Sequence, residues 1–127
     1  MTIKTFTPKN LFKPIGPYSH IATSGPFISI SGTPGINSET GKLVGDAYSQ
    51  SRQIVKNMRE MLESVGSKLE DVINVNVFLK RVEDFEEMNR AYAEEFGNHH
   101  PARTVICIAD LPKKDALMTM NLTAIKM

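Results

Sequence analysis

An arginine at the start of an apolar segment is the residue whose chemistry most clearly requires a partner. Residues 99–112 are HHPARTVICIADLP, and Arg103 stands where the chain after Pro101 turns apolar and is expected to enter a core. A guanidinium group does not lose its proton in a protein, so a buried one needs an anion. Two anions fit: an acidic side chain of this chain or of a neighbouring copy, or the carboxylate of a ligand gripped by the planar fork. The residues around Arg103 leave both alternatives open.

Four other residues have groups suited to a small polar ligand. Tyr18, in the segment IGPYS, follows a Gly-Pro turn, where a tyrosine usually packs with its hydroxyl in water but can also line a pocket and donate a hydrogen bond. Ser31 and Gly32, in SISGTPG, end an expected strand; glycine allows close backbone approach, although a strand-ending turn is the simpler explanation. Asn89 lies one position past the apolar stripe of an expected helix, where an amide is mildly unfavourable and, if buried, needs partners.

Cysteine and histidine do not form the pattern of a nucleophile or a metal site. Cys107 has no histidine or acid at a spacing that would activate a thiolate, so a small buried residue is its expected role. His99 and His100 point apart on an extended chain and lack nearby cysteines or closely spaced acids. The many helical glutamates are explained by a solvated face. We therefore expect no metal site.

Two amphipathic helices are expected to support these residues. The first starts at Asp46, a good N-cap, and carries apolar or small residues at spacings of three and four up to Gly66. The second starts at Asp84, with Glu87 three residues later in the pattern of a capping box, and ends at Gly97. Each helix therefore offers one apolar face for packing.

Alternating apolar residues predict strands over 26–31, 72–79, 104–108 and 117–125, with weaker candidates near 4–6 and 19–23. This order predicts an α+β fold, a mixed sheet with both helices packed on one face. The opposite face is expected to mix polar and apolar residues: Ser29, Ser31, Asn74, Asn76, Arg103, Cys107, Thr119 and Asn121 with Phe27, Phe78 and Val105. Such a face is typical of a subunit interface, so an oligomer is expected.

The composition predicts one domain over residues 1–127, without a linker or repeat. The chain has 15 basic and 14 acidic residues, a formal net charge of +1, and therefore no field directed at nucleic acid or anionic lipid. Aromatic residues make up 7% and tryptophan is absent, which argues against a base-stacking surface. One cysteine, no apolar signal segment and no membrane-length stretch predict a soluble cytoplasmic protein.

Five segments, in a fixed order, resemble the Rid family of reactive intermediate deaminases, also called RidA/YjgF. They are IGPYS, ISISGTPG, the helix around 53–58, DVINVNVFLKRVEDFEEMNRAYAEEF and HPARTVICIADLP. The resemblance spans nearly the whole chain. It implies a chorismate-mutase-like fold and a homotrimer whose sheets form an inner barrel, with clefts between subunits.

The same resemblance implies hydrolysis of enamine or imine intermediates, such as 2-aminoacrylate/2-iminopropanoate, to 2-keto acids and ammonia without a cofactor. In that reaction Arg103 is expected to hold the substrate carboxylate. The residues expected to line or support the cleft are Tyr18, Ser31, Gly32 and Asn89. The partners implied are a small carboxylate-bearing imine, enamine or keto acid and further copies of the chain.

Two expected catalytic positions depart from the family pattern. Val105 stands where the family usually has a cysteine, and its backbone carbonyl can still hold a water. By our alignment, Asn121 stands where deaminating members carry a glutamate that orients and deprotonates the attacking water. An amide cannot take that proton at neutral pH, and losing acid–base help typically costs about 10²–10⁴ in rate.

Two functions therefore follow from the resemblance. One is an imine deaminase, and the alternative is a non-catalytic or weakly catalytic trimer that binds small carboxylates or a partner protein. A ribonuclease or translation inhibitor, a label the family also carries, is disfavoured by the near-neutral charge and the sparse aromatics.

Overall fold

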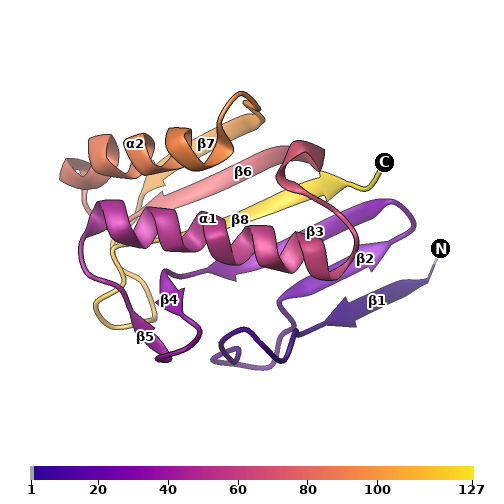
Figure 1. Ribbon diagram of the computed structural model, residues 1–127. Helices are drawn as coiled ribbons and strands as arrows, with labels where there is room; N and C mark the ends of the chain where they lie inside the picture. Colours follow the sequence, from indigo (N-terminus) through magenta and orange to yellow (C-terminus); the bar gives the residue numbers. More distant parts are fainter. Residues whose placement is uncertain (1) are drawn as a thin grey trace.

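The computed structural model describes residues 2–127, which form a twisted mixed sheet with both long helices on one face (Figure 1). The sheet order is β1-β2-β3-β8-β6-β7. Its strands are β1 (Ile3–Phe6), β2 (Ile21–Ser24), β3 (Phe27–Thr33), β6 (Val72–Leu79), β7 (Ala102–Cys107) and β8 (Met118–Ile125), and the helices are α1 (Ala47–Ser64) and α2 (Phe85–Phe96). A hairpin of β4 (Ile36–Asn37) and β5 (Lys42–Leu43) precedes α1, and 3-10 turns lie at Leu69–Asp71 and Val82–Asp84. The predicted α+β layer architecture is confirmed.

One strand pair is parallel, and its connection explains the position of α2. Strands β6 and β7 run parallel, whereas every other neighbouring pair in this sheet is antiparallel. A parallel pair needs a crossover, and α2 supplies it on the same face as α1. This topology leaves β7 at one edge of the sheet, directly beneath α2.

The hydrophobic core lies between the helices and the sheet. Ile54 and Met58 of α1 are fully buried, as are Val75 and Val77 of β6 and Met120 of β8. Burial of each such side chain contributes about 1.5–3 kcal/mol relative to exposure. Residues three and four apart form the apolar face of α1, and every second residue of the strands forms the sheet face that packs against it. The apolar residues of this pattern therefore form the layer between the helices and the sheet.

The two helices begin differently. The carboxylate of Asp46 accepts a hydrogen bond from Ser49 N at 2.9 Å, as predicted for an N-cap. The capping box predicted at Asp84 is wrong, because its side chain makes no cap bond. Asp84 instead accepts hydrogen bonds from Arg81 Nε at 3.0 Å and Nη2 at 2.9 Å. The 3-10 turn before α2 places this aspartate outside capping geometry.

The orientation of β7 corrects one sequence prediction that concerns the site. Arg103 is in register with Val75 and Val105 with Val77, and side chains in register on neighbouring strands share a face. Because both valines of β6 face the core, the prediction that Arg103, Val105 and Cys107 point away from the helices is wrong. Cys107 is also exposed rather than buried. Apolar residues occupy both phases of this strand, so its alternation could not fix its orientation.

The sheet face that no helix covers, called here the open face, carries exposed apolar side chains. Phe27, Ile73 and Ile106 are 49%, 47% and 48% exposed. The alternation over 72–79 places Ile73 on the same side as Val75 and Val77, but a register shift in β6 between Val72 and Asn74 turns it outward. Among them, Asn76 Nδ2 donates to Asn121 Oδ1 at 2.9 Å across β6 and β8. The open face therefore mixes polar and apolar groups, as the sequence predicted.

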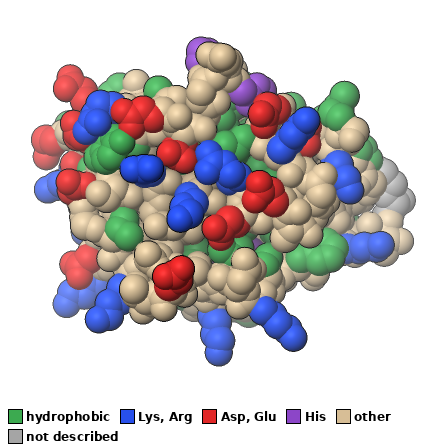
Figure 2. All heavy atoms as spheres, viewed as in Figure 1, with side chains coloured by type: hydrophobic (Ala, Val, Ile, Leu, Met, Phe, Trp, Pro, Cys, Tyr) green, Lys and Arg blue, Asp and Glu red, His purple; other side chains and the backbone are tan. Residues whose placement is uncertain are grey.

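The helical surface has a different character. Figure 2 shows acidic and basic side chains intermixed over this side of the molecule. Glu95 pairs with Arg52 at 3.4 Å and with Arg59 at 3.1 Å, and Arg90 pairs with Glu87 at 2.6 Å. The exposed pair of Arg90 and Glu87 contributes little stability, and the mixture of signs builds no single-sign patch. None of the helices in residues 2–127 combines the length and hydropathy needed to cross a bilayer.

Candidate functional site

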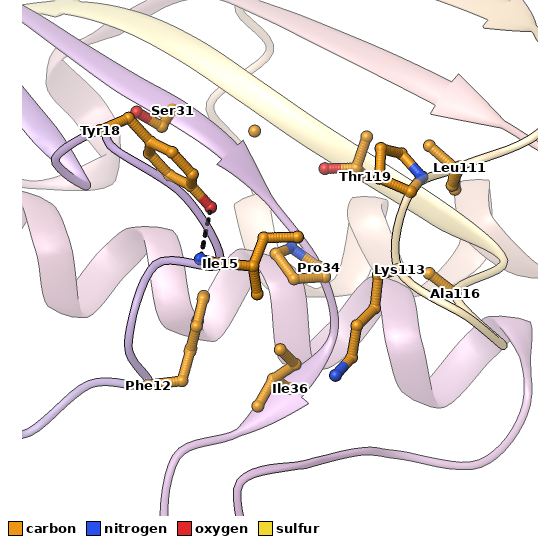
Figure 3. A pocket seen from close by; sticks show the side chains of 12 residues that line it. Phe12, Ile15, Tyr18, Ser31, Pro34, Ile36, Leu111, Lys113, Ala116 and Thr119 are labelled. Atoms are coloured by element: carbon orange, nitrogen blue, oxygen red, sulfur yellow. Dashed lines mark hydrogen bonds between the residues drawn. The ribbon is translucent and has the colours of Figure 1, made fainter.

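The larger of two cavities near the predicted residues lies where β3 ends and β8 begins. We call it the Tyr18 pocket; its volume is about 430 Å³. Its polar lining residues are Tyr18, Ser31, Gly32, Lys113 and Thr119, and its apolar ones are Phe12, Ile15, Pro34, Ile36, Leu111, Pro112 and Ala116. Figure 3 shows these side chains converging from the segment before β2, from β3 and β4, and from the loop before β8. The pocket therefore joins three of the four residues that the resemblance placed in the cleft.

The polar end of the Tyr18 pocket is held by short-range hydrogen bonds. Ile15 N donates to Tyr18 Oη at 3.4 Å, which leaves the hydroxyl proton of Tyr18 free to be donated (Figure 3). Ser31 Oγ donates to Ser19 O at 2.6 Å, and this bond fixes the turn that carries the tyrosine against β3. The pocket thus presents one orientable hydroxyl beside a strand end.

Arg103 lies in a second, smaller cavity on the helical side of the sheet. We call it the Arg103 pocket; its volume is about 220 Å³, and it is lined by Asn89, Tyr92, Ala93, Phe96, His100, Pro101 and Arg103. Arg103 Nη1 donates to Asn89 Oδ1 at 2.7 Å, and the guanidinium carbon lies 4.7 Å from the centre of the Tyr92 ring. Asn89 is half-buried and has the partner that a buried amide needs. Helix α2 therefore orients the arginine through one hydrogen bond and one cation–π contact.

Arg103 differs from four other arginines in having no carboxylate partner within residues 2–127. None of the ion pairs formed within residues 2–127 includes it, whereas Arg52, Arg59, Arg81 and Arg90 all pair with carboxylates. Asn89 and Tyr92 are neutral, so they position the charge without compensating it. Of the partners left open by the sequence, the salt bridge within one copy is not formed among residues 2–127, which leaves an acid of a neighbouring copy or the carboxylate of a ligand.

The two pockets are separate within one copy of the chain. Thr119 of β8 is in register with Phe78, while Arg103 of β7 is in register with Val75, three residues away along β6. Strands β7 and β8 are two strand spacings apart, about 10 Å, and three residues along a strand add about 10 Å. Arg103 also faces the helices, whereas Thr119 faces away from them. One small molecule cannot contact both within a single copy.

Tyr92 has a buried hydroxyl without a hydrogen-bond partner in residues 2–127. The side chain is 7% exposed and stacks on Phe96 with ring centres 4.5 Å apart. Burial raises the pKa of Tyr92 to about 12, and the charge of Arg103 opposes that rise. The ring supports the guanidinium, but the hydroxyl is desolvated without compensation, which typically costs about 1–3 kcal/mol.

Replacing Tyr92 by phenylalanine is therefore expected to raise the free energy of unfolding by about 1 kcal/mol in urea titrations at neutral pH. The folded-state pKa of Tyr92 exceeds the usual value of 10.0, so the unfolded chain loses this proton first. The wild type should then lose stability as the pH rises from about 10 to 12, and the phenylalanine variant should lose less. A destabilised variant would mean that the hydroxyl has a partner, such as a trapped water.

The remaining predicted residues lie in different places. Val105 faces the helices and packs against the core, and it lines neither pocket. Asn121 is bonded to Asn76 on the open face and likewise lines neither pocket. Thr119, two residues earlier on β8, does line the Tyr18 pocket, and a β-carbon at Gly32 would lie 3.4 Å from its Oγ1. The sequence reasoning placed Thr119 on the open face but did not single it out, because threonine alternating in a strand carries no catalytic signal.

Histidine, cysteine and acidic side chains do not gather into a cluster within the described part of the chain. In residues 2–127, no group of three or more histidine, cysteine, aspartate or glutamate side chains is placed to hold one. His99 is engaged elsewhere, with Nε2 2.8 Å from Val72 O. The polar groups that line the two pockets belong to Tyr18, Ser31, Lys113 and Thr119 in the first and to Asn89, Tyr92, His100 and Arg103 in the second.

Comparison with known proteins places this geometry in a family. The family model described as endoribonuclease L-PSP matches residues 8–126. A RutC family protein of Pyrococcus horikoshii is 44% identical over 119 residues, which cover 93% of this chain and 94% of that protein. The 2-iminobutanoate/2-iminopropanoate deaminase of Escherichia coli K12 is 34% identical over 113 residues, 87% of this chain and 88% of that enzyme. The crystal structure of E. coli TdcF with bound serine has a TM-score of 0.91 at 26% identity, covering 98% of this chain and 99% of that one.

These matches extend over almost the full length of the chain and of its relatives, and they include the fold as well as the sequence. The resemblance carried by five ordered segments is thereby confirmed. The chain belongs to the Rid family, whose members are also called YjgF or L-PSP proteins.

Proposed function

We propose that this protein hydrolyses 2-imino acids, in equilibrium with their enamine tautomers, to 2-keto acids and ammonia. The observation that carries the proposal is the guanidinium of Arg103, which α2 orients through Asn89 and Tyr92 and which forms no ion pair within residues 2–127. A guanidinium held in this way can bind a carboxylate through two parallel hydrogen bonds, which the ammonium of a lysine cannot do. The name of the E. coli relative, a 2-iminobutanoate/2-iminopropanoate deaminase, supports the same substrate class.

The proposed reaction balances without an oxidant or a cofactor. Water adds through its oxygen to the imine carbon, the carbon–nitrogen bond breaks, and a carbon–oxygen double bond replaces it. The two protons of the water leave with the nitrogen as ammonia. The carboxylate is unchanged throughout, so a cation bound to it holds substrate and product alike and fixes the position of the reacting carbon.

The site is proposed to form between copies of the chain. Because the Tyr18 pocket and Arg103 are too far apart for one small molecule within a copy, a cleft that uses both needs Arg103 of one copy beside the Tyr18 pocket of another. The half-apolar open face supports this assembly, since exposed Phe27, Ile73 and Ile106 favour burial. A homotrimer with the sheets lining an inner barrel, as the resemblance implies, provides three such clefts.

Each residue of this cleft is proposed to have a separate role in binding or catalysis. Arg103 and its support Asn89 bind the carboxylate, the Tyr18 hydroxyl donates a hydrogen bond to the departing nitrogen, and Ser31 and Gly32 shape the strand end where water approaches. Asn121 and the backbone carbonyl of Val105, predicted from the sequence to hold that water, line neither pocket within one copy and are assigned no role in this cleft. Tyr18 fits its role because its oxygen already accepts from Ile15 N.

The position of the family's glutamate on β8 can be tested directly. Thr119 lines the Tyr18 pocket, whereas Asn121, the position taken from sequence, does not. Thr119→Glu is therefore expected to raise imine hydrolysis by about 10–100-fold, because it adds a proton acceptor beside the reacting carbon. Asn121→Glu is expected to change the rate little. The two variants are compared by their initial rates of keto-acid formation, and unfolding curves confirm that both are folded. A gain confined to Asn121→Glu would instead support the sequence alignment.

A binding protein without fast turnover is the second candidate, and one observation favours it. Of the residues in 2–127 that line the two pockets, none is an aspartate or a glutamate. Such a protein would still hold small carboxylates through Arg103. The bound serine in the E. coli TdcF structure supports carboxylate binding in this fold. The endoribonuclease name of the family model finds less support here, since the net charge is +1.

The deciding experiment is a coupled assay. An amino-acid oxidase generates the imino acid in situ, and semicarbazide competes with the protein for it. An enzyme lowers the initial rate of semicarbazone formation at catalytic amounts, because the keto acid that it produces reacts with semicarbazide more slowly than the imine does. A binding protein lowers it only when its concentration approaches that of the imine. Absence of both effects would contradict the proposed function.

A further inference from the structure

We propose, on the basis of the function proposed above, that the preferred substrate is a 2-imino acid with a bulky apolar side chain, and that the Tyr18 pocket receives this side chain. The pocket volume of about 430 Å³ lies within the range of roughly 300–1,000 Å³ typical of sites that enclose sizeable ligands. An alanine-sized imine would leave the apolar walls of this half-open pocket in contact with water. A substrate with a larger apolar side chain would cover those walls, and removing them from water is favourable.

The lining is graded: its hydroxyl groups gather on one side, where Leu111 also lies, and most apolar side chains lie across from them, with Lys113 running toward Ile36. Figure 3 shows Tyr18, Ser31 and Thr119 along one side of the cavity and Phe12 and Ile36 on the opposite side, with Ile15 and Pro34 between them. A substrate whose imine lies beside the Tyr18 hydroxyl would direct its side chain toward these apolar residues. The grading therefore matches a molecule that is polar at one end and hydrocarbon at the other.

The apolar walls are held in place and do not depend on the ligand. His20, 2% exposed, has Nε2 2.6 Å from Phe12 O, and its ring meets the Phe12 ring edge-on with centres 4.8 Å apart. On the other side, Asn57 Nδ2 donates to Ile36 O at 2.9 Å. Because buried side chains anchor the backbone behind Phe12 and Ile36, the cavity is preformed, which lowers the cost of filling it.

The side chain of Lys113 bears on whether an apolar or an acidic substrate side chain is preferred. It is a charged lining residue, and Figure 3 shows its side chain running along the cavity toward Ile36. Lysine stems commonly cover apolar surface while the ammonium remains in water, and that is the role assigned to it here. If the ammonium instead served as a counter-ion, a glutamate-derived imine would be preferred.

The test compares imines generated from alanine, leucine, phenylalanine and glutamate in the coupled assay. Each buried methylene is worth about fourfold in binding, so the kcat/KM for the leucine-derived imine should exceed that for the alanine-derived imine by about tenfold or more. Ile15→Asp places a charge on the apolar wall at a residue that is 61% exposed, so folding tolerates it. This variant should reduce the leucine-to-alanine ratio by about tenfold.

Val82→Asp is the matched control, because Val82 is 66% exposed and lies outside the pocket, in the turn before α2. It should leave the ratio unchanged. A faster reaction with the alanine- or glutamate-derived imine would overturn the substrate preference while leaving imine hydrolysis standing. No acceleration with any imine would overturn the proposed function and this inference with it.

Discussion

Replacing Arg103 by glutamine is expected to lower kcat/KM for a 2-imino acid by about a hundredfold or more. Truncating one partner of a charge-assisted contact in a partly buried site typically costs about 2–5 kcal/mol, and each 1.4 kcal/mol is a factor of ten. Glutamine keeps a donor that can reach Asn89, so the pocket should retain its shape. The loss should appear in the rate of ammonia release at low substrate concentration, where kcat/KM is measured directly.

The matched control is Arg90→Gln. Arg90 also lies over a tyrosine, with its guanidinium carbon 4.0 Å from the centre of the Tyr48 ring, but it pairs with Glu87 and Glu94 on the exposed face of α2. This variant should retain activity. If both variants lost activity equally, the effect would come from α2 as a whole and not from a carboxylate bound at residue 103.

Arg103→Lys separates charge from shape. Lysine keeps the positive charge but loses the planar fork and its cation–π stacking on Tyr92. An intermediate rate is expected, between those of the wild type and Arg103→Gln. Full activity in the lysine variant would show that charge alone suffices and that the bidentate geometry assigned to Arg103 is wrong.

The layered fold was predictable because most elements carry an unambiguous period. In β8 the apolar residues Met118, Met120, Leu122 and Ala124 alternate with polar ones, and all four are buried. In α1 the stripe from Ala47 to Leu62 meets this face. At these positions the apolar spacing of each element coincides with the face that is buried, so the sequence pattern alone predicted the element and its buried face.

The site was only partly predictable, since it depends on orientation and on contacts distant in sequence. Strand β7 has apolar residues in both phases, and only its parallel pairing with β6 shows that Arg103 faces α2. The separation of Arg103 from Tyr18 depends on the strand order, which the sequence order does not give. The residue types identified the guanidinium of Arg103 and the hydroxyl of Tyr18 as candidate groups. The distance between them, by contrast, follows only from the strand order of the folded sheet.

The largest loss of stability is expected from Gly35→Ala. A β-carbon at this position would lie 2.9 Å from both Cα and O of Gln50, and these are backbone atoms of α1 that cannot rotate away. Overpacking of this kind costs typically 1–3 kcal/mol, and rigid surroundings favour the upper end. Gln50 is itself 2% exposed, and its side chain bonds Val44 O at 3.1 Å and Leu117 N at 2.9 Å. Displacing it would also strain these bonds, so we expect a loss of about 3 kcal/mol or more.

Gly45→Ala provides the control in the same region. Gly45 O accepts from Gln50 Nε2 at 3.3 Å, but no heavy atom lies within 4 Å of a β-carbon added at Gly45. Its substitution should change the free energy of unfolding by less than about 1 kcal/mol. Urea titrations of the two variants measure the difference. Equal midpoints would contradict the close approach of residue 35 to α1.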